Sequence, residues 1–272
     1  MIYEMQTNAP LIHEKFQFGD SESDHFETEG YYIFEHCLTD EALEEGRSHI
    51  DRMLDQRVDD FPGTEMMSPH QLGEKWMWDI MTDPKILDFV ERRLGQNLVL
   101  WHADLLCKEP EIGREILWHQ DQAYWDAQQV RAPLAILWVP FDDVDEANGT
   151  MSVLPGEHVN GMLPGLSIEG DFFGLAVSPE ALPQDSEERE VIYRLRAGQA
   201  GTHSSYVPHR SRPNLSNAWR RVMTMHFMRA DAKEMGERHY TSYLDQQKFD
   251  REYYLVRGED VNNRGLKRSP FE

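Results

Sequence analysis

Cysteine is scarce in this sequence, and long apolar runs are absent. The chain of 272 residues contains two cysteines, Cys37 and Cys107, so we expect two small buried apolar side chains rather than a disulfide framework. No stretch approaches the roughly 18 uninterrupted apolar residues that a membrane-spanning helix requires. The N-terminus lacks the basic region and apolar core of a signal peptide, and we therefore expect a cytoplasmic protein.

Positive charge is also in short supply, because 27 Lys and Arg residues stand against 49 Asp and Glu residues, which gives a formal net charge of −22. A field of this sign repels phosphate backbones and anionic lipids, so the composition disfavours nucleic-acid and membrane partners. It leaves room for a local basic pocket that binds a small anion. With 40% hydrophobic residues the chain can bury a sizeable core, which excludes wholesale disorder.

The first part of the chain has helical patterning. Residues 40–56 carry apolar side chains at helical spacing, with Thr39 as the expected N-cap and acidic residues in the first turn. Residues 84–94 form a second apolar stripe, with Thr82 as the expected cap and Gly95 as the end of the helix. We expect both apolar faces to pack against a core.

Short apolar runs bounded by Pro and Gly replace the helical spacing in the second part of the chain, which predicts a β-sandwich or barrel. The dipeptide Asn148-Gly149 predicts a tight hairpin between two of these strands. The polar, acidic residues 1–30 are expected to form an irregular lead-in. The expected strands cover residues 31–34, 98–101, 115–118, 134–139, 150–154, 191–195 and 222–228.

Nothing in the sequence marks a boundary between domains. We find no internal repeat, no low-complexity linker and no shift in composition, so a single domain over 1–272 is expected. It would consist of a helical N-terminal part (1–95), an antiparallel β core (96–230) and a C-terminal extension (231–272).

The segment Trp118-His119-Gln120-Asp121 is the sharpest local feature. On a strand, residues i and i+2 project from the same face, so His119 and Asp121 would converge on one point. A neutral nitrogen and an anionic oxygen are two of the three ligands of a 2-His-1-carboxylate site. The pair alone is a weak signal, because a half-exposed histidine hydrogen-bonded to an aspartate is the more common explanation. The pair His102 and Asp104 has the same pattern.

A second block of polar residues lies about ninety residues downstream. His209 is the candidate for a third metal ligand, and Arg220 follows it by eleven residues at the start of the last clear strand. The planar guanidinium of Arg220 could hold a carboxylate through two hydrogen bonds, and Ser211 could add a hydroxyl donor. Taken singly, His209 could be a surface-loop histidine and Arg220 or Arg221 a solvated charge.

Together these segments resemble the phytanoyl-CoA dioxygenase family of iron(II)- and 2-oxoglutarate-dependent oxygenases. The resemblance runs from about residue 118 to 221, and the order of the N-terminal helices also fits. It is carried by Trp118-His119-Gln120-Asp121 with Tyr124-Trp125, Trp138, Asn148-Gly149-Thr150, Pro155-Gly156-Glu157-His158, and His209 with Ser211, Asn214, Ser216 and Arg220.

The resemblance implies a mainly β fold with flanking α-helices, in which the core is a double-stranded β-helix (a jelly roll, cupin-like). It implies Fe(II), 2-oxoglutarate and O2 as cofactor and cosubstrates, with oxidation, by default hydroxylation, of a small-molecule metabolite and decarboxylation of 2-oxoglutarate to succinate. The implied iron ligands are His119, Asp121 and His209. Arg220 and Ser211 would hold the far carboxylate of 2-oxoglutarate, and Trp138 lies on the strand that lines the cosubstrate site.

Substrate residues are less well marked. Candidates are Tyr124, Trp125, Phe172, Phe173 and Lys108, of which the two phenylalanines lie in an irregular insertion, residues 161–190, that could roof the site. Packing in the core explains the phenylalanines equally well. The acidity of the chain disfavours a CoA thioester, whose phosphates require a basic cluster, and favours a small neutral, zwitterionic or cationic metabolite. His102 and Asp104 are expected to be ordinary strand residues.

Two other functions remain open at this point. Two histidines and one aspartate can also hold zinc in a metal-dependent hydrolase, although a hydrolase has no need of a carboxylate clamp at Arg220. A non-catalytic jelly-roll binding protein with a vestigial site is the third possibility. Because Asp121 occupies the position where halogenating members of the superfamily bind a halide, halogenation is disfavoured.

Overall fold

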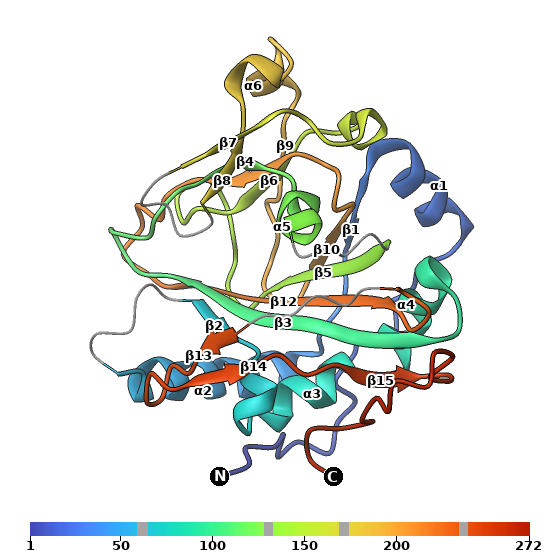
Figure 1. Cartoon of the computed structure of the whole chain (residues 1–272). Coiled ribbons are helices and arrows are strands. Elements are labelled where there is room, and N and C mark those ends of the chain that lie inside the picture. Colours follow the sequence, from blue (N-terminus) through green and yellow to red (C-terminus); the bar gives the residue numbers. More distant parts are fainter. Residues whose placement is uncertain (59–64, 128–132, 169–173, 234–238) are drawn as a thin grey trace.

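Two antiparallel β-sheets face one another in the computed structural model, which describes residues 1–58, 65–127, 133–168, 174–233 and 239–272 (Figure 1). The larger sheet has the strand order β1 (Tyr31–Phe34), β10 (Ala200–His203), β5 (Leu134–Pro140), β12 (Arg220–Arg229), β3 (Leu98–Lys108) and β15 (Tyr254–Arg257), and β2 (Glu65–Met67) also pairs with β3. The smaller sheet has the order β4 (Ile116–His119), β11 (His209–Ser211), β6 (Met151–Val153) and β9 (Val191–Ile192). This is the jelly-roll arrangement expected from the sequence.

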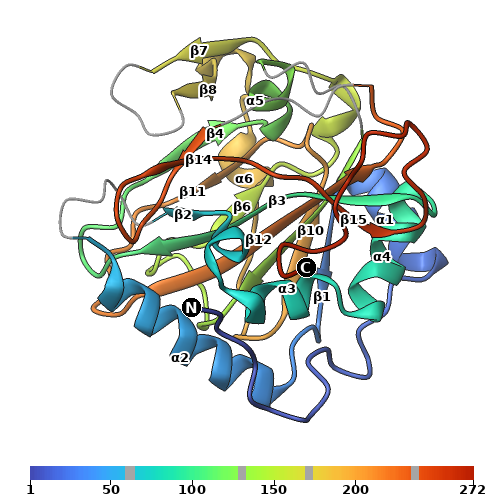
Figure 2. The ribbon, with the colours of Figure 1, turned by 60° about the horizontal axis from the view of Figure 1, so that its bottom comes forward.

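Two short hairpins and several helices surround the sheets. The hairpins are β7 (Gly165–Ser167) with β8 (Leu175–Val177), and β13 (His239–Thr241) with β14 (Lys248–Asp250). The helices are α1 (Asp20–Glu29), α2 (Asp40–Gln56), α3 (Lys75–Met81), α4 (Pro84–Leu94), α5 (Asp121–Ala127) and α6 (Ser186–Arg189), with 3₁₀ turns at Pro69–Leu72, Glu157–Asn160 and Pro179–Ala181. In Figure 2, α2, α3 and α4 lie on the side of the larger sheet that is turned away from the smaller one.

The main hydrophobic core lies between these helices and the outer face of the larger sheet. Alternate residues of the central strands pack into it, for example Leu105 of β3, Leu137 of β5 and Met225 of β12, all fully buried. The residues between them point to the opposite face, toward the smaller sheet. One face of the larger sheet therefore supports the helices, and the other is available to line a cavity.

A β-bulge interrupts the pairing of β3 with β12. His226 pairs with His102, whereas the next residue, Phe227, pairs with Leu100, so Trp101 is an extra residue on β3. Because of this extra residue, Trp101 and His102 both face the cavity between the sheets. The residues that follow His102 keep the new alternation as far as the end of the strand.

The structure corrects two predictions for the N-terminal part. Residues 20–29 are helix α1 rather than an irregular lead-in: Glu22 accepts a hydrogen bond from the backbone N–H of Gly19, and Phe26 is buried. Helix α4 is capped by Asp83, whose carboxylate accepts from the N–H of Lys85 at 2.9 Å, and not by Thr82. Thr82 instead ends α3, where its hydroxyl donates to the carbonyl of Trp78. The other helix, α2, begins after Thr39 as predicted.

The hairpin predicted at Asn148-Gly149 is also wrong. The strands on either side, β5 and β6, belong to different sheets, so the dipeptide lies in the connection between them. Asn148 accepts from the N–H of Asp145 and donates to the carbonyl of Asp143, which closes a local loop. Gly149 has φ +76°, and a Cβ atom there would lie 2.3 Å from the carbonyl oxygen of Arg212. The close approach of two chain segments therefore explains the glycine.

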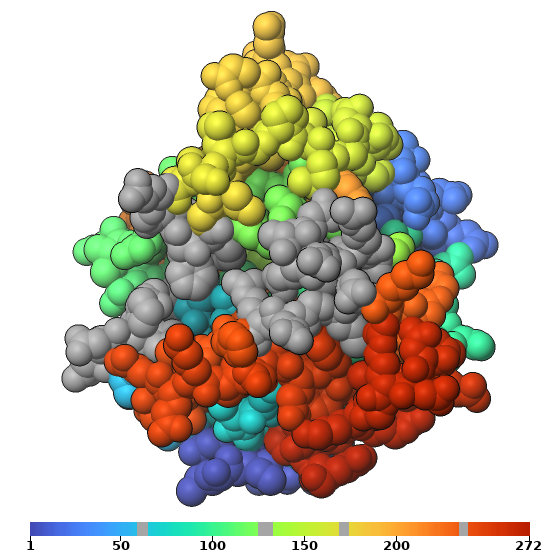
Figure 3. Space-filling view, in the orientation of Figure 1, coloured from blue at the N-terminus to red at the C-terminus, as the bar shows by residue number. Residues whose placement is uncertain are grey.

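The first strand and the last strand of the chain belong to the same sheet. Strand β1 lies at one end of the larger sheet and β15 at the other. Figure 3 shows the later part of the chain on one face, with the orange-to-red C-terminal segment below and the yellow segment above it.

Both cysteines are buried and free, as expected. No helix among the described residues is long and apolar enough to cross a membrane.

A pair of glycine substitutions tests the close approach at Gly149. Gly156 has nearly the same backbone, φ +77°, but a Cβ there would meet nothing within 4 Å. Gly156→Ala should lower the free energy of unfolding by about 1 kcal/mol through backbone strain alone. Gly149→Ala should cost about 2 kcal/mol more, because the backbone of residue 212 would have to move. Equal midpoints in urea unfolding of the two variants would contradict this explanation.

Candidate metal centre

A cavity between the two sheets collects most of the polar side chains that the sequence singled out. His119 and Asp121 reach it from β4 and the start of α5, and His209 reaches it from β11. His119 and His209 are direct neighbours across the β4–β11 pairing. Gln120, which lies between the first two residues, points the other way and is held by the carbonyls of Gly161 and Tyr206. The alternation expected from the sequence therefore occurs.

The donor atoms of His119, Asp121 and His209 all lie within 4.8 Å of one another. The Asp121 Oδ1 atom is 3.8 Å from Nε2 of His119 and 3.4 Å from Nε2 of His209. Two ligands bound at right angles about 2.1 Å from a metal ion are about 3.0 Å apart, so these separations suit a metal centre after small movements.

The two histidines are already oriented for metal binding. Nδ1 of His119 lies 2.8 Å from the carbonyl oxygen of Leu117, and Nδ1 of His209 lies 3.1 Å from that of Val207. A carbonyl oxygen can only accept, so Nδ1 of each ring acts as the donor to it. Nε2 of each ring is then the nitrogen available to a metal ion. Burial, with a contribution from His209, lowers the pKa of His119 to about 3, which favours the neutral imidazole that a metal requires.

His203, which the sequence analysis did not single out, holds the other oxygen of Asp121. Its Nε2 lies 3.2 Å from Oδ2 of the aspartate. Burial alone would raise the pKa of Asp121, but the hydrogen bonds and charges of His209 and His203 lower it well below its usual value. His203 lies at the end of β10, far from His119 and Asp121 in sequence, and the pairing of β10 in the larger sheet brings it to them.

Arg220 and Arg221 are separated by the structure. Arg220 lines the cavity and is 2% exposed, its Nε has no hydrogen-bond partner, and no carboxylate of the described residues lies within ion-pair distance. Burial lowers the pKa of Arg220 to about 10. Arg221 points elsewhere and is neutralised by Asp142, whose Oδ1 is 2.6 Å from its Nη2, and by Asp51. Arg220 is therefore the buried cation that can take an anionic ligand.

Ser211 and Lys108 lie beside Arg220. Nζ of Lys108 donates to the Ser211 hydroxyl at 2.9 Å. Lys108 and Arg220 are opposite one another in the backbone pairing of β3 with β12. Burial, followed by the charge of Arg220, lowers the pKa of Lys108 to about 6. Ser211 lines the cavity, and Lys108 lies behind it and does not line the cavity itself. This arrangement gives no support to the prediction that Lys108 faces a substrate.

The remaining candidates have different outcomes. Trp138, on β5, is 3% exposed and lines the cavity, as does Tyr124, whose hydroxyl donates to the carbonyl of Leu175 at 3.0 Å. Trp125 belongs to α5, but its side chain is not described, and Phe172 and Phe173 lie outside the described residues. The described residues of the insertion 161–190 contribute no side chain to the cavity lining.

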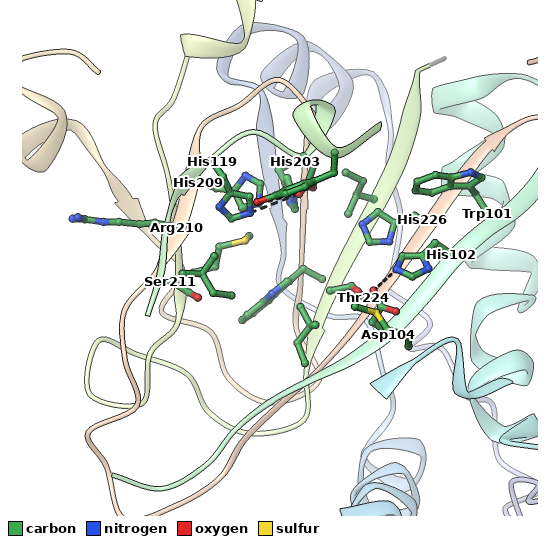
Figure 4. A pocket seen from close by; sticks show the side chains of 18 of the residues that line it. Trp101, His102, Asp104, His119, His203, His209, Arg210, Ser211, Thr224 and His226 are labelled. Carbon is green, nitrogen blue, oxygen red and sulfur yellow. Dashed lines mark hydrogen bonds and ion pairs between the residues drawn. The ribbon is translucent and has the colours of Figure 1, made fainter. Parts of the chain in front are cut away.

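A second group of possible ligands lies in the same cavity. His102, Asp104 and His226 are all buried, and their donor atoms also fall within 4.8 Å of one another. Figure 4 shows them beside Trp101 and Thr224, across the cavity from His119, His203 and His209. His102 and Asp104 are strand residues as expected, but they are not ordinary ones, since the bulge turns them toward the cavity.

His203 offers a direct test of how Asp121 is positioned. His203→Ala should weaken the binding of Fe(II) by about 10- to 100-fold, because Asp121 loses the hydrogen bond that orients it. Isothermal titration of the anaerobic protein measures this change. The control is His239→Ala, which removes a similar His–Asp pair, with Asp250, at the surface. Unchanged affinity in the His203 variant would show that Asp121 needs no such support.

Solved structures with the same fold include a non-heme monooxygenase and a protein complexed with 2-oxoglutarate. The non-heme monooxygenase ThoJ, in its apo form, superposes with a TM-score of 0.67 over 92% of this chain and 89% of its own, at 24% identity. EvdO2 from Micromonospora carbonacea var. aurantiaca, complexed with 2-oxoglutarate, has a TM-score of 0.65 over 84% of this chain and 98% of its own, at 21% identity. At such identities the likeness establishes the fold class, a cupin-like jelly roll.

The family is established by the sequence itself. The model of the phytanoyl-CoA dioxygenase (PhyH) family matches residues 26–222, and the chain belongs to this family, as the motifs indicated. The family depends on Fe(II), 2-oxoglutarate and O2.

Curated relatives cover a range of activities. A probable alpha-ketoglutarate-dependent hypophosphite dioxygenase of Stutzerimonas stutzeri is 31% identical over 160 residues, which are 56% of this chain and 53% of that protein. The L-proline trans-4-hydroxylase of Streptomyces griseoviridis is 24% identical over 168 residues, 58% of this chain and 59% of its own. The matches thus span about half the length of these relatives.

Proposed function

We propose that the protein is an Fe(II)- and 2-oxoglutarate-dependent dioxygenase that oxidises, by default hydroxylates, a small-molecule metabolite. The observation that carries the proposal is that three ligand side chains line one cavity together with a buried arginine that has no carboxylate partner among the described residues. His119, Asp121 and His209 would bind the metal, and Arg220 would bind the far carboxylate of 2-oxoglutarate. Membership of the PhyH family supports the same assignment.

The residues present fit both groups. Two imidazoles and one carboxylate form a set that leaves coordination positions open, as a chelating cosubstrate requires. A buried guanidinium without a carboxylate is unfavourable by itself, and an anionic ligand removes that penalty. When bound, Fe(II) and 2-oxoglutarate supply the activation of O2, with release of succinate and CO2 and oxidation of a substrate C–H bond.

The protein itself binds the cosubstrate, orients the metal ligands and keeps water out of the site. Arg220 can donate two parallel hydrogen bonds to a carboxylate, and the Ser211 hydroxyl, positioned by Lys108, can contribute a third. Trp138 is buried in the cavity wall and limits the access of water to this end. His203 holds Asp121 in place while the two histidines keep their protons on Nδ1.

The two alternatives explain fewer of these contacts. A metal-dependent hydrolase would use the same three ligands but gives Arg220 no role, since its substrate water needs no buried cation so placed. A vestigial binding protein does not require oriented imidazoles. A small-molecule substrate fits the family. The lack of nucleic-acid and membrane partners and the cytoplasmic location remain predictions from the sequence.

The test is an anaerobic titration with Fe(II) and then 2-oxoglutarate, followed by visible absorption. We expect a metal-to-ligand charge-transfer band that requires both additions, and succinate release once O2 and a substrate are supplied. Asp121→Ala should abolish the band because the metal loses its anionic ligand, whereas Asp104→Ala, at the second cluster, should keep it. A folded, iron-loaded protein without a band would contradict the proposal and favour the alternatives.

Arg220 and Arg221 provide a matched pair for the cosubstrate. Arg220→Ala should raise the 2-oxoglutarate concentration needed for half-maximal band intensity by about 100-fold, because the carboxylate loses a charged, buried partner. Arg221→Ala should change it by less than about twofold, since Arg221 is occupied by Asp142 and Asp51. The reverse ranking would move the carboxylate site to Arg221.

A further inference from the structure

The second polar cluster, His102, Asp104 and His226, has no role in the function proposed so far. These residues are 8%, 5% and 8% exposed, and all three line the cavity that contains the candidate metal centre. Figure 4 shows this cluster and the pair His119 and His209 on opposite sides of the same space. A molecule held by this cluster would extend toward the metal ligands.

The backbone is specially arranged to present this cluster. The extra residue at Trp101 turns His102 and then Asp104 into the cavity, instead of toward the helices. On the neighbouring strand, Thr224 pairs with Asp104 and His226 pairs with His102. Two adjacent strands therefore place four polar side chains side by side on a buried face, where apolar residues would be the ordinary choice.

The distances distinguish this cluster from the metal centre. Nε2 of His102 is 2.5 Å from Oδ2 of Asp104, which is the length of a short hydrogen bond. Two ligands on one metal ion would be about 3.0 Å apart or more, as they are around Asp121. The hydroxyl of Tyr240 lies 2.7 Å from the other ring nitrogen of His102 and holds the ring in this position. The cluster is thus a hydrogen-bonded group.

One oxygen of Asp104 is left without a partner. Oδ1 is buried and accepts no hydrogen bond, and no Lys or Arg among the described residues forms an ion pair with Asp104. The hydroxyl of Thr224, opposite it, is also buried and without a partner. Arg251 lines the cavity too, but it bonds to the Tyr253 hydroxyl and lies over the ring of Trp101. A buried carboxylate oxygen in this state is costly unless a ligand supplies a donor.

A cationic donor satisfies this position better than a neutral one. Burial, with the neighbouring His102, lowers the pKa of His226 to about 3, so His226 is neutral and does not compensate the carboxylate. An ammonium group has three donors, so it can bond at once to Oδ1 of Asp104 and to Oγ1 of Thr224, and its charge strengthens the bond to the carboxylate. The net charge of −22 favours the approach of a cation from solution.

We propose that Asp104 and Thr224 bind a protonated amine of the substrate, at the end of the cavity opposite His119, Asp121 and His209. This assignment rests on the proposed function, because it names the substrate class of the same site: a small metabolite that carries an amine. The apolar tail of a lipid thioester would leave the Asp104 carboxylate desolvated and unpaired at this end.

The test compares two ring compounds of equal size, piperidine, which is protonated at neutral pH, and tetrahydropyran, an ether. Each is titrated into the full-length protein loaded with Zn(II) and 2-oxoglutarate, and the affinity is measured by NMR. Piperidine should bind at least about tenfold more tightly, because its hydrogen bonds are assisted by charge. Asp104→Asn should remove this preference. Asp55→Asn, the same change at an exposed position on α2, should keep it.

Several outcomes would overturn the proposal. Equal affinities, no binding of either compound, or a preference that persists in Asp104→Asn would each contradict it. A second equivalent of Zn(II) that is lost in Asp104→Asn would identify the cluster as a metal site instead. Failure of the protein to bind Zn(II) and 2-oxoglutarate would contradict the proposed function as well, whereas normal loading with equal affinities for the two compounds contradicts this inference alone.

Discussion

The antiparallel pairing of β12 with β3 and β5 is the constraint on which the site depends. Along β12, one set of alternate residues packs beneath the helices, and the other set, which includes Arg220, Thr224 and His226, faces the cavity. The strand therefore reaches from the cosubstrate end to the far end of the cavity. Any shift of one residue in this pairing would exchange the two sets and place charged groups in the core.

Two aspartates that line the cavity show how different surroundings suit one residue type to different tasks. Asp121 is surrounded by His119, His203 and His209, which together stabilise its negative charge and keep its oxygens oriented. Asp104 receives one hydrogen bond, from His102, and keeps an oxygen available. The surroundings of Asp121 suit a residue that holds a metal ion throughout the reaction. Those of Asp104 suit a residue that binds and releases a substrate. Both lie in a protein with a formal net charge of −22.

The sequence predicted the parts of the structure that depend on local patterning. The helix after Thr39, the strands and the convergence of His119 with His209 followed from spacing and family motifs, because those signals act over a few residues or are carried by a known motif. The hairpin at Asn148-Gly149 was wrong because the turn signal cannot say which sheet the next strand joins. His203 was missed for a related reason: its position depends on pairing between distant strands. The role of Asp104 depends on a bulge, which leaves no mark in composition or periodicity.

The bulge at Trp101 also has a consequence for how relatives of this protein are compared. A single inserted or deleted residue at this point would invert the facing of one half of β3, and residues that support the helices would be exchanged with those that line the cavity. Two relatives that both have the bulge therefore place the same positions of β3 in the cavity. Two relatives of which only one has the bulge place different positions there, even when more of their residues are identical. For this strand, chain length is as informative as residue identity, and changes of substrate in the family can arise by insertion as well as by substitution.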